Sequence, residues 1–213
     1  MKRTILLSVL LFAWVSQINF THAATLTFDD LITGSTSYAF DGDGDSLNDV
    51  VFSTADPLGF NTVGPGYNMT YISEPGLEGT SLLNPDLRVD FLVGARDSIS
   101  FGFALDSYTE DDTASFSLYD SGGILLATST MTGLYTTTGL GTSSFPEGFM
   151  DISFSGTAAY GLFDFTSDIG RYIIDDFSGT FGTTEVPEPG TLLLFGLGLL
   201  GLAGFSKKKS YTS

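Results

Sequence analysis

The sequence predicts an all-β domain, an antiparallel β-sandwich of the jelly-roll kind, between two apolar terminal segments. Three observations predict it. The central part of the chain contains short runs in which apolar and polar residues alternate, as expected of half-buried strands. Stretches rich in Gly, Asp and Ser separate these runs, and none of the runs has the periodicity of an amphipathic helix. Many short strands joined by such turns are typical of sandwiches and barrels.

The strand prediction is clearest in four runs. In "SISFGFAL", residues 98–105, the side chains of Ile99, Phe101 and Phe103 share one face. The same alternation is present in "LRVDFLVG" (87–94), "ASFSLYD" (114–120) and "MDISFSG" (150–156). We therefore expect antiparallel strands with one face on a core and the other in water. The runs lack the long outward apolar faces of a membrane barrel, and no repeat of fixed period indicates a solenoid or propeller.

The N-terminal segment has the layout of a secretory signal peptide. Lys2 and Arg3 precede an apolar stretch at residues 5–15, and the small residues of "THAA" follow at 21–24. We expect a signal helix, with residues 1–23 removed on export. A plain N-terminal membrane anchor is the alternative, although the apolar stretch is short for a span.

The body that remains, residues 24–185, is strongly acidic. It contains three arginines, no lysine and 24 acidic residues, which gives a net charge of −21. Such a surface repels nucleic acids and anionic lipids, so no nucleic-acid partner is expected. The chain has no Cys, and its only Trp and only His, Trp14 and His22, lie in the signal segment.

These absences favour a protein that is not an enzyme. Without His or Cys in the body, Ser–His–Asp and Cys–His mechanisms lack a base, and zinc hydrolysis lacks its ligands. A glycosidase with two carboxylates stays open, with Glu74 and Glu78 of "SEPGLEG" as candidates. Both candidates lie in a Pro/Gly loop, and the body has no Trp to stack on sugars. A glycan-processing enzyme is therefore the third interpretation.

The sharpest motif of the body is "DGDGDSLND", residues 41–49, which resembles the DxDxD calcium loops of dockerin and thrombospondin type-3 modules. Carboxylates at every second residue of a tight loop converge on one hard cation and repel one another without it. We therefore expect a bound Ca²⁺ that pins the loop, with an unoccupied acidic loop as the alternative. Loop positions 1, 3, 5, 7 and 9 are Asp41, Asp43, Asp45, Leu47 (through its carbonyl) and Asp49.

The loop departs from the calcium pattern at two positions. Ser46 stands at position 6, where Gly is usual, and Phe52 stands at position 12, where an acid is usual. A strand, not a helix, is expected to follow, and Asp30 or Asp56 would supply a missing ligand. The expected affinity is that of extracellular modules, on the order of 10⁻⁴–10⁻³ M.

Two further features leave alternatives open. The pairs Asp29–Asp30 and Asp175–Asp176 come near the two ends of the body, either as a second cation site or as solvated strand ends. Exposed tyrosines on a sandwich can bind carbohydrate. The candidates are Tyr67, Tyr71, Tyr108, Tyr119 and Tyr135.

The C-terminal stretch "VPEPGTLLLFGLGLLGLAGFSKKK", residues 186–209, has three parts. Its first part is a motif formed by Pro187, Glu188 and Pro189. Residues 191–205 are apolar, about 22 Å long as a helix, against a hydrocarbon core of about 30 Å. The third part is a basic end made of Lys207, Lys208 and Lys209. We expect a short transmembrane helix whose lysine end lies in the cytoplasm.

This order of parts strongly resembles the PEP-CTERM sorting signal of exported bacterial proteins. The resemblance covers about 25 of the 213 residues. It implies recognition and processing near the Pro-Glu-Pro motif by an exosortase in the inner membrane. Proteins with this signal belong to Gram-negative bacteria that make extracellular polysaccharide, and they reach the cell surface, the matrix or the biofilm. The body looks like the sandwich ectodomains that such proteins commonly carry, a resemblance that names no ligand.

The expected organisation is a signal peptide at 1–23, a sandwich ectodomain at 24–180 and a sorting signal at 181–213. The expected function is that of an exported structural or adhesive protein of the cell surface or of the biofilm and exopolysaccharide matrix. A calcium-dependent carbohydrate-binding module is the alternative. The expected partners are an exosortase, the inner membrane through the C-terminal helix, and extracellular polysaccharide.

Overall fold

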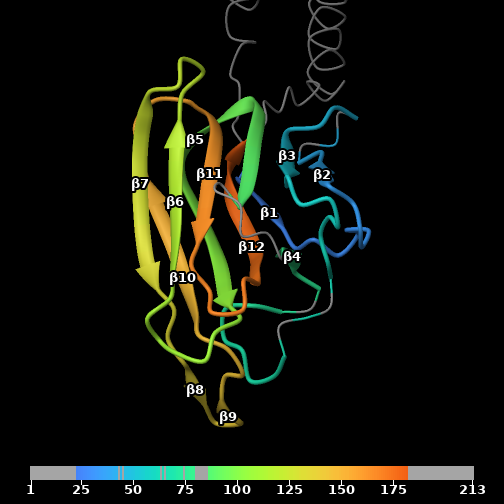
Figure 1. The fold of residues 1–213 in the computed structure, drawn as a ribbon. Coiled ribbons are helices and arrows are strands. Elements are labelled where there is room, and N and C mark those ends of the chain that lie inside the picture. Colours follow the sequence, from blue (N-terminus) through green and yellow to red (C-terminus); the bar gives the residue numbers. More distant parts are fainter. Residues whose placement is uncertain are drawn as a thin grey trace, which may run out of the picture. The chain divides into compact units, whose positions relative to one another are not determined.

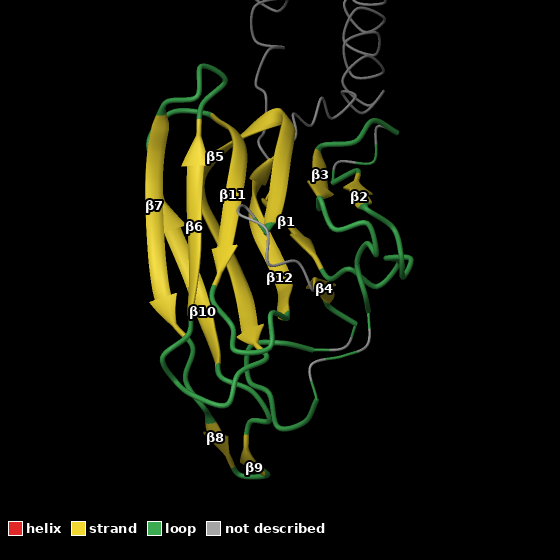
Figure 2. Cartoon of the chain, viewed as in Figure 1, coloured by secondary structure: helices red, strands yellow, loops and turns green. Residues whose placement is uncertain are grey.

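The computed structural model describes residues 23–181, apart from residues 43, 45, 63, 65, 74 and 80–85. In this part the chain forms strands, turns and loops only, as Figures 1 and 2 show, which confirms the all-β prediction. No helix in the described ranges is long and apolar enough to cross a membrane. The predicted signal helix and the predicted transmembrane helix lie outside the described residues.

Twelve strands follow one another along the described chain. They are β1 (Ala23–Leu26), β2 (Ser37–Phe40), β3 (Val50–Ser53), β4 (Leu77–Gly79), β5 (Leu87–Leu105), β6 (Thr113–Tyr119), β7 (Leu125–Thr132), β8 (Thr137–Thr138), β9 (Gly141–Thr142), β10 (Glu147–Ser153), β11 (Ala158–Phe165) and β12 (Tyr172–Phe181). All their pairings are antiparallel.

The strands form two layers. The front sheet of Figure 1 has the order β2-β3-β5-β11-β6-β7. In the back sheet, β1 and β4 both pair with β12, which pairs with β5, and β5 pairs with β10. The short strands β8 and β9 form a separate hairpin at one end. The fold is therefore an antiparallel β-sandwich, as predicted.

The two sheets share β5, which bends over one end of the sandwich. Residues 87–91 pair with β3 and β11, whereas residues 98–105 pair with β10 and β12. Gly94 and Asp97 mark the bend, with φ angles of 84° and 69°. A Cβ on Gly94 would lie 2.4 Å from the Thr157 side chain, so the bend requires glycine there. The two runs predicted as separate strands are thus one strand of 19 residues.

Phenylalanine rings from both sheets fill the core. Phe101 of the back sheet lies 5.4 Å from Phe116 and 5.2 Å from Phe163 of the front sheet, between ring centroids. Phe177 on β12 lies 5.9 Å from Phe101. All four rings are fully buried. The buried residues of this core among those described fall between residues 26 and 181, within the compact unit Thr21–Thr183.

A loop segment, residues 66–76, covers the outer face of the back sheet. Two buried carboxylates fasten it. Glu147 accepts hydrogen bonds from the backbone N–H groups of Thr70 and Tyr71, at 2.9 Å each. Asp175 accepts from both the backbone N–H and the hydroxyl of Ser73, at 2.9 and 2.8 Å. Buried charges need such donors, so these bonds fix the path of the segment.

This cover corrects the prediction that the second face of "SISFGFAL" is in water. Gly102 and Ala104, which were expected to face solvent, are buried under the segment. Ala104 belongs to a second, smaller cluster with Ile72 and Ile173. The end of β5 is therefore buried on both faces, as in the centre of a three-layer arrangement.

Candidate functional site

The acidic loop at residues 41–49 joins β2 to β3 and is tightly turned. The carboxylate of Asp41 accepts hydrogen bonds from the N–H groups of Gly44 and Ser46, at 2.6 and 2.8 Å. Gly44 and Ser46 have φ angles of 78° and 73°. Ser46 therefore adopts the left-handed conformation that glycine takes at position 6 of a calcium loop. Each oxygen of Asp41 keeps a second lone pair for a cation.

The other end of the loop is anchored in the front sheet. Asp49 is buried, and its Oδ2 accepts a hydrogen bond of 2.7 Å from the Gly42 N–H. Its backbone pairs with Phe40 and Leu92. The Asp49 carboxylate thus binds the backbone of the loop, whereas the side chain of Leu47 is exposed. Asp43 and Asp45 lie outside the described residues.

Position 12 of the loop and the two residues expected to replace its missing ligand all have structural roles. Phe52, at position 12, is fully buried and packs edge-on against Phe177 at 5.0 Å. The sequence departs from the calcium pattern there because the residue belongs to the core. Asp56 accepts from the Leu58 N–H, and Asp30 accepts from the Tyr38 hydroxyl at 2.7 Å.

The two acidic pairs do not gather into a second cation site in the described part of the chain. β1 does pair with β12, with Leu26 opposite Phe177, as expected of first and last strands. Asp175, however, is fully buried under the covering segment, and burial raises the pKa of its carboxyl. No group of three or more His, Cys, Asp or Glu side chains among the described residues is arranged to hold a metal.

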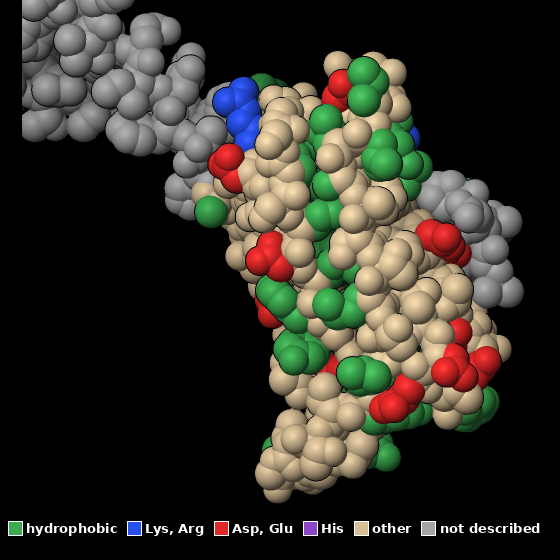
Figure 3. Space-filling model, turned by 90° about the vertical axis from the view of Figure 1, so that its left-hand side faces the viewer, with side chains coloured by type: hydrophobic (Ala, Val, Ile, Leu, Met, Phe, Trp, Pro, Cys, Tyr) green, Lys and Arg blue, Asp and Glu red, His purple; other side chains and the backbone are tan. Residues whose placement is uncertain are grey.

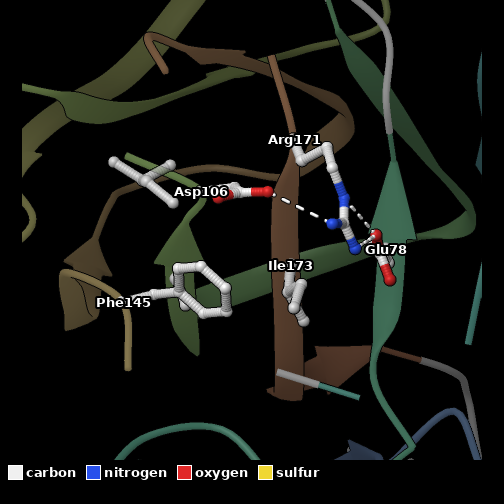
Figure 4. A pocket seen from close by; sticks show the side chains of 7 residues that line it. Glu78, Asp106, Phe145, Arg171 and Ile173 are labelled. Atoms are coloured by element: carbon white, nitrogen blue, oxygen red, sulfur yellow. Dashed lines mark hydrogen bonds and ion pairs between the residues drawn. The ribbon is translucent and has the colours of Figure 1, made fainter. Parts of the chain in front are cut away.

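Glu78, a candidate carboxylate of the glycosidase interpretation, lies in a small pocket shown in Figure 4. Arg171 donates to Glu78 through Nε at 2.7 Å and through Nη2, and to Asp106 through Nη1 at 3.2 Å. Burial raises the pKa of Glu78, and the Arg171 guanidinium opposes that rise. Ala104, Leu105, Phe145 and Ile173 complete the lining.

This arrangement is structural in form. The Arg171 guanidinium bridges Glu78 and Asp106, so these two carboxylates leave no space between them for a scissile bond. The free volume is about 10 Å³, roughly the space that one water molecule needs. The second candidate, Glu74, lies outside the described residues.

Four of the five candidate tyrosines belong to loops at the end of the sandwich that carries the β8–β9 hairpin. Tyr67 bonds to Ser144, next to this hairpin, and Tyr71 packs 6.2 Å from Phe149. Tyr135 donates its hydroxyl hydrogen to the Ser107 carbonyl, beside Tyr108. As whole residues, Tyr67 and Tyr108 are 71% and 80% exposed.

The fifth tyrosine has a different setting, on the outer face of the front sheet. Tyr119 stacks on Tyr160 at 5.0 Å, and the Arg88 guanidinium lies 4.2 Å from the centre of the Tyr160 ring. Arg88 also pairs with Asp90. The sequence did not indicate this stack, because its three side chains come from strands that are distant in the chain.

The loops at the hairpin end also gather acidic residues that the sequence shows as separate turns. Asp168 accepts from the Ser107 hydroxyl at 3.2 Å and donates its N–H to Asp112 at 2.9 Å. Glu110 accepts from the Tyr135 N–H at 2.8 Å. These carboxylates therefore cap loop backbones. Figure 1 places the 41–49 loop at the opposite end, beside the bend of β5.

Comparison with known proteins identifies the class first. Residues 185–209 match the PEP-CTERM protein-sorting motif, which confirms the prediction made from Pro187, Glu188, Pro189 and the lysine end. The chain is therefore an exported protein with an all-β domain. More specifically, it carries a PEP-CTERM sorting signal, which implies processing by an exosortase-type enzyme. These residues lie outside the described part.

Comparison with solved structures finds weak similarity over most of the domain. The K2 adhesin domain of Lys-gingipain matches with a TM-score of 0.42 and 15% identity, over 76% of this chain and 100% of that one. The K3 adhesin domain of Lys-gingipain from Porphyromonas gingivalis gives 0.39 and 15%, over 73% and 97%. The C-terminal family 22 carbohydrate-binding module of Clostridium thermocellum Xyn10B gives 0.37 and 10%, over 78% and 96%. No curated protein sequence matches significantly.

Proposed function

We propose that this protein is a structural or adhesive component of the cell surface or of the extracellular polysaccharide matrix of a Gram-negative bacterium. The match of residues 185–209 to the sorting motif carries the proposal. An apolar helix at 191–205 holds the precursor in the inner membrane, with Lys207–Lys209 inside. Exosortase cleavage near Pro187–Pro189 then frees the ectodomain for the surface or the biofilm.

A role without catalysis is part of the proposal. The body lacks His and Cys, and its buried carboxylates have structural partners in the described ranges. Glu147 and Asp175 fasten the covering segment, and Glu78 pairs with Arg171. Carboxylates that already accept hydrogen bonds from backbone N–H groups or from a guanidinium are poorly suited to exchange protons with a substrate.

We also propose that Ca²⁺ binds the 41–49 loop and pins it to the front sheet. The support is the turn at Asp41, the left-handed backbone at Ser46 and the burial of Asp49. Asp41, Asp43, Asp45, Asp49 and the Leu47 carbonyl would hold the ion. Its role would be to neutralise the closely spaced carboxylates.

The sorting proposal is tested by fractionating cells of a Gram-negative host that has an exosortase. Deleting residues 186–213 should release the ectodomain from the membrane fraction. Replacing Pro187, Glu188 and Pro189 by Ala should leave a longer, unprocessed precursor in the membrane, whereas Ala at Thr183 and Thr184 should change nothing. An unchanged distribution of the deletion variant would rule the proposal out.

Carbohydrate binding at the hairpin end is the second candidate function. The exposed rings of Tyr67 and Tyr108 favour it, since sugars stack on exposed aromatic rings. In this carbohydrate-binding proposal, Ca²⁺ stabilises the fold and does not contact the sugar, because the 41–49 loop lies at the end of the sandwich opposite the β8–β9 hairpin. A glycan array should show binding that Tyr67→Ala and Tyr108→Ala each weaken. An array without signal counts against this candidate.

A further inference from the structure

The strand β7 forms a free edge of the front sheet. It pairs with β6 on one side, with an irregularity at Leu126. On its other side it forms no ladder with any described strand, although Leu134, just beyond its end, bridges to Glu147 of β10. An edge strand presents unpaired backbone N–H and C=O groups that can template another strand. Natural proteins commonly protect such edges with Lys, Pro or a bulge facing outward. The strand β7 contains no Pro, and its irregularity at Leu126 lies near its start, so residues 127–132 form the regular part of the edge.

The edge belongs to the longest uncharged stretch of this acidic domain. No charged residue occurs from Ser121 to Pro146, although the whole chain has a net charge of −17. Where the surface carries acidic residues, two approaching copies would place carboxylates opposite one another, which is unfavourable. Along β7 two copies can meet without such local repulsion.

Apolar side chains accompany the edge. Ile124 is 65% exposed, Leu125 50% and Met131 36%. Figure 3 looks onto this side of the molecule and shows hydrophobic side chains gathered in a stripe along it, with acidic side chains at its margins. Burying such a stripe would add apolar contact to the backbone pairing.

We propose that a second copy of this chain binds here, through antiparallel pairing of β7 with its counterpart. A two-fold axis through the middle of β7 makes the contact self-complementary, as in most homodimers. It joins the two front sheets into one continuous sheet. An uncharged strand offers nothing to a charged partner, whereas it suits a second uncharged strand of the same sequence. This inference does not depend on the proposed sorting or on sugar binding.

The test measures the oligomeric state of residues 24–183, which span nearly all of the compact unit Thr21–Thr183, by light scattering after gel filtration. The dimer should strengthen as NaCl rises from about 0.05 to about 0.5 M, because screening weakens the remaining repulsion between two acidic copies. Thr130→Lys should raise the dissociation constant at least tenfold, because it places two like charges across the axis. A monomer at every concentration and salt level would overturn the proposal.

Matched variants separate charge from local disruption. Thr130 shares a hydrogen bond of 2.8 Å with Ser115. Thr130→Val removes that bond without adding charge and should leave the dimer intact. Thr36→Lys adds the same charge at an exposed residue outside the edge and should also dimerise normally. A dimer equally weakened by Thr36→Lys would show that net charge, and not the β7 edge, controls association.

A cross-linking test does not depend on whether the fold tolerates the Thr130→Lys substitution. The chain has no Cys, so a single introduced cysteine is unique. Cysteine at 128, 129 or 130 should give a disulfide-linked dimer for at least one position, since opposed Cβ atoms near the axis lie within about 5.5 Å. Thr36→Cys should stay monomeric under the same oxidation. Cross-linking at none of the three β7 positions would contradict the pairing.

Discussion

The carbonyl oxygen of Tyr71 lies directly over Gly102, so close that a Cβ on Gly102 would be 1.8 Å from it. The covering segment and β5 are therefore in backbone contact at this point. No residue with a Cβ fits at position 102 without moving the segment. The atom in the way belongs to the main chain, which the hydrogen bonds from Thr70 and Tyr71 to Glu147 hold in place.

We predict that Gly102→Ala displaces the covering segment and destabilises the domain by several kcal/mol, on the scale of an overpacked core. The chemical denaturation midpoint should fall, and proteolysis should cut within residues 66–76. Gly139→Ala is the control, since a Cβ there meets nothing within 4 Å. Equal stability of the two variants would mean that the segment does not pack as described.

Removing the central ring of the core should cost more than any surface change. Phe101 contacts Phe116, Phe163 and Phe177, and Phe101→Ala leaves a cavity among them. We expect a loss of about 3–5 kcal/mol in the free energy of unfolding. Leu140, which is 86% exposed, provides the control, and Leu140→Ala should stay within about 0.5 kcal/mol. Calorimetry of both variants measures the difference, and a Phe101→Ala protein as stable as the control would refute this core.

The alternation of residues predicted this core, because period-two patterns depend only on neighbours in the chain. Phe101 and Phe116 were placed on inward faces by the sequence alone, and they are buried. The sorting motif was equally accessible, since it is a linear signal that an enzyme reads from consecutive residues.

Features that depend on distant segments could not be read in this way. The cover over Gly102 requires residues 66–76 to cross another sheet, and nothing near Gly102 in the sequence indicates it. The β7 edge was missed as a full strand, because both its faces are partly exposed and its pattern does not alternate. Phe52 was read as a defect of a calcium loop, yet its burial in the core decides its identity.

Buried carboxyl groups should make the domain more stable in mild acid. Burial raises the pKa of Asp86 to about 6, while a hydrogen bond from the Phe165 N–H opposes the rise. Burial also raises the pKa values of Glu78 and Asp175. Between pH of about 4 and about 6 the folded chain thus binds more protons than the unfolded chain. Stability is therefore highest below this window and falls as the pH rises through it, for Asp86 by on the order of 2 kcal/mol.

Thermal unfolding at pH 4.5 and 7 measures this effect, and the melting temperature should be higher at pH 4.5. Asp86→Asn keeps an oxygen that can accept from the Phe165 N–H, so it should flatten the pH dependence and stabilise the domain at pH 7. Asp111→Asn, at an exposed residue, should keep the wild-type pH dependence. A melting temperature that falls on acidification would contradict the prediction.

Calcium should stabilise the domain through the 41–49 loop. With a dissociation constant on the order of 0.5 mM, about 5 mM CaCl₂ adds about 1.4 kcal/mol to the free energy of unfolding. Asp43→Ala and Asp45→Ala should each abolish the gain. Asp41→Ala should lower stability even in EDTA, because it also removes the bonds to Gly44 and Ser46.

Two controls separate site binding from general screening of an acidic surface. Asp111→Ala lowers the negative charge equally but should respond to calcium as the wild type does, since Asp111 lies outside the loop. Mg²⁺ at the same concentration screens equally well, but it demands a stricter octahedral geometry and should stabilise less. If EDTA leaves the melting temperature of the wild type unchanged, or if Mg²⁺ matches Ca²⁺, the loop is held by its own hydrogen bonds and not by an ion.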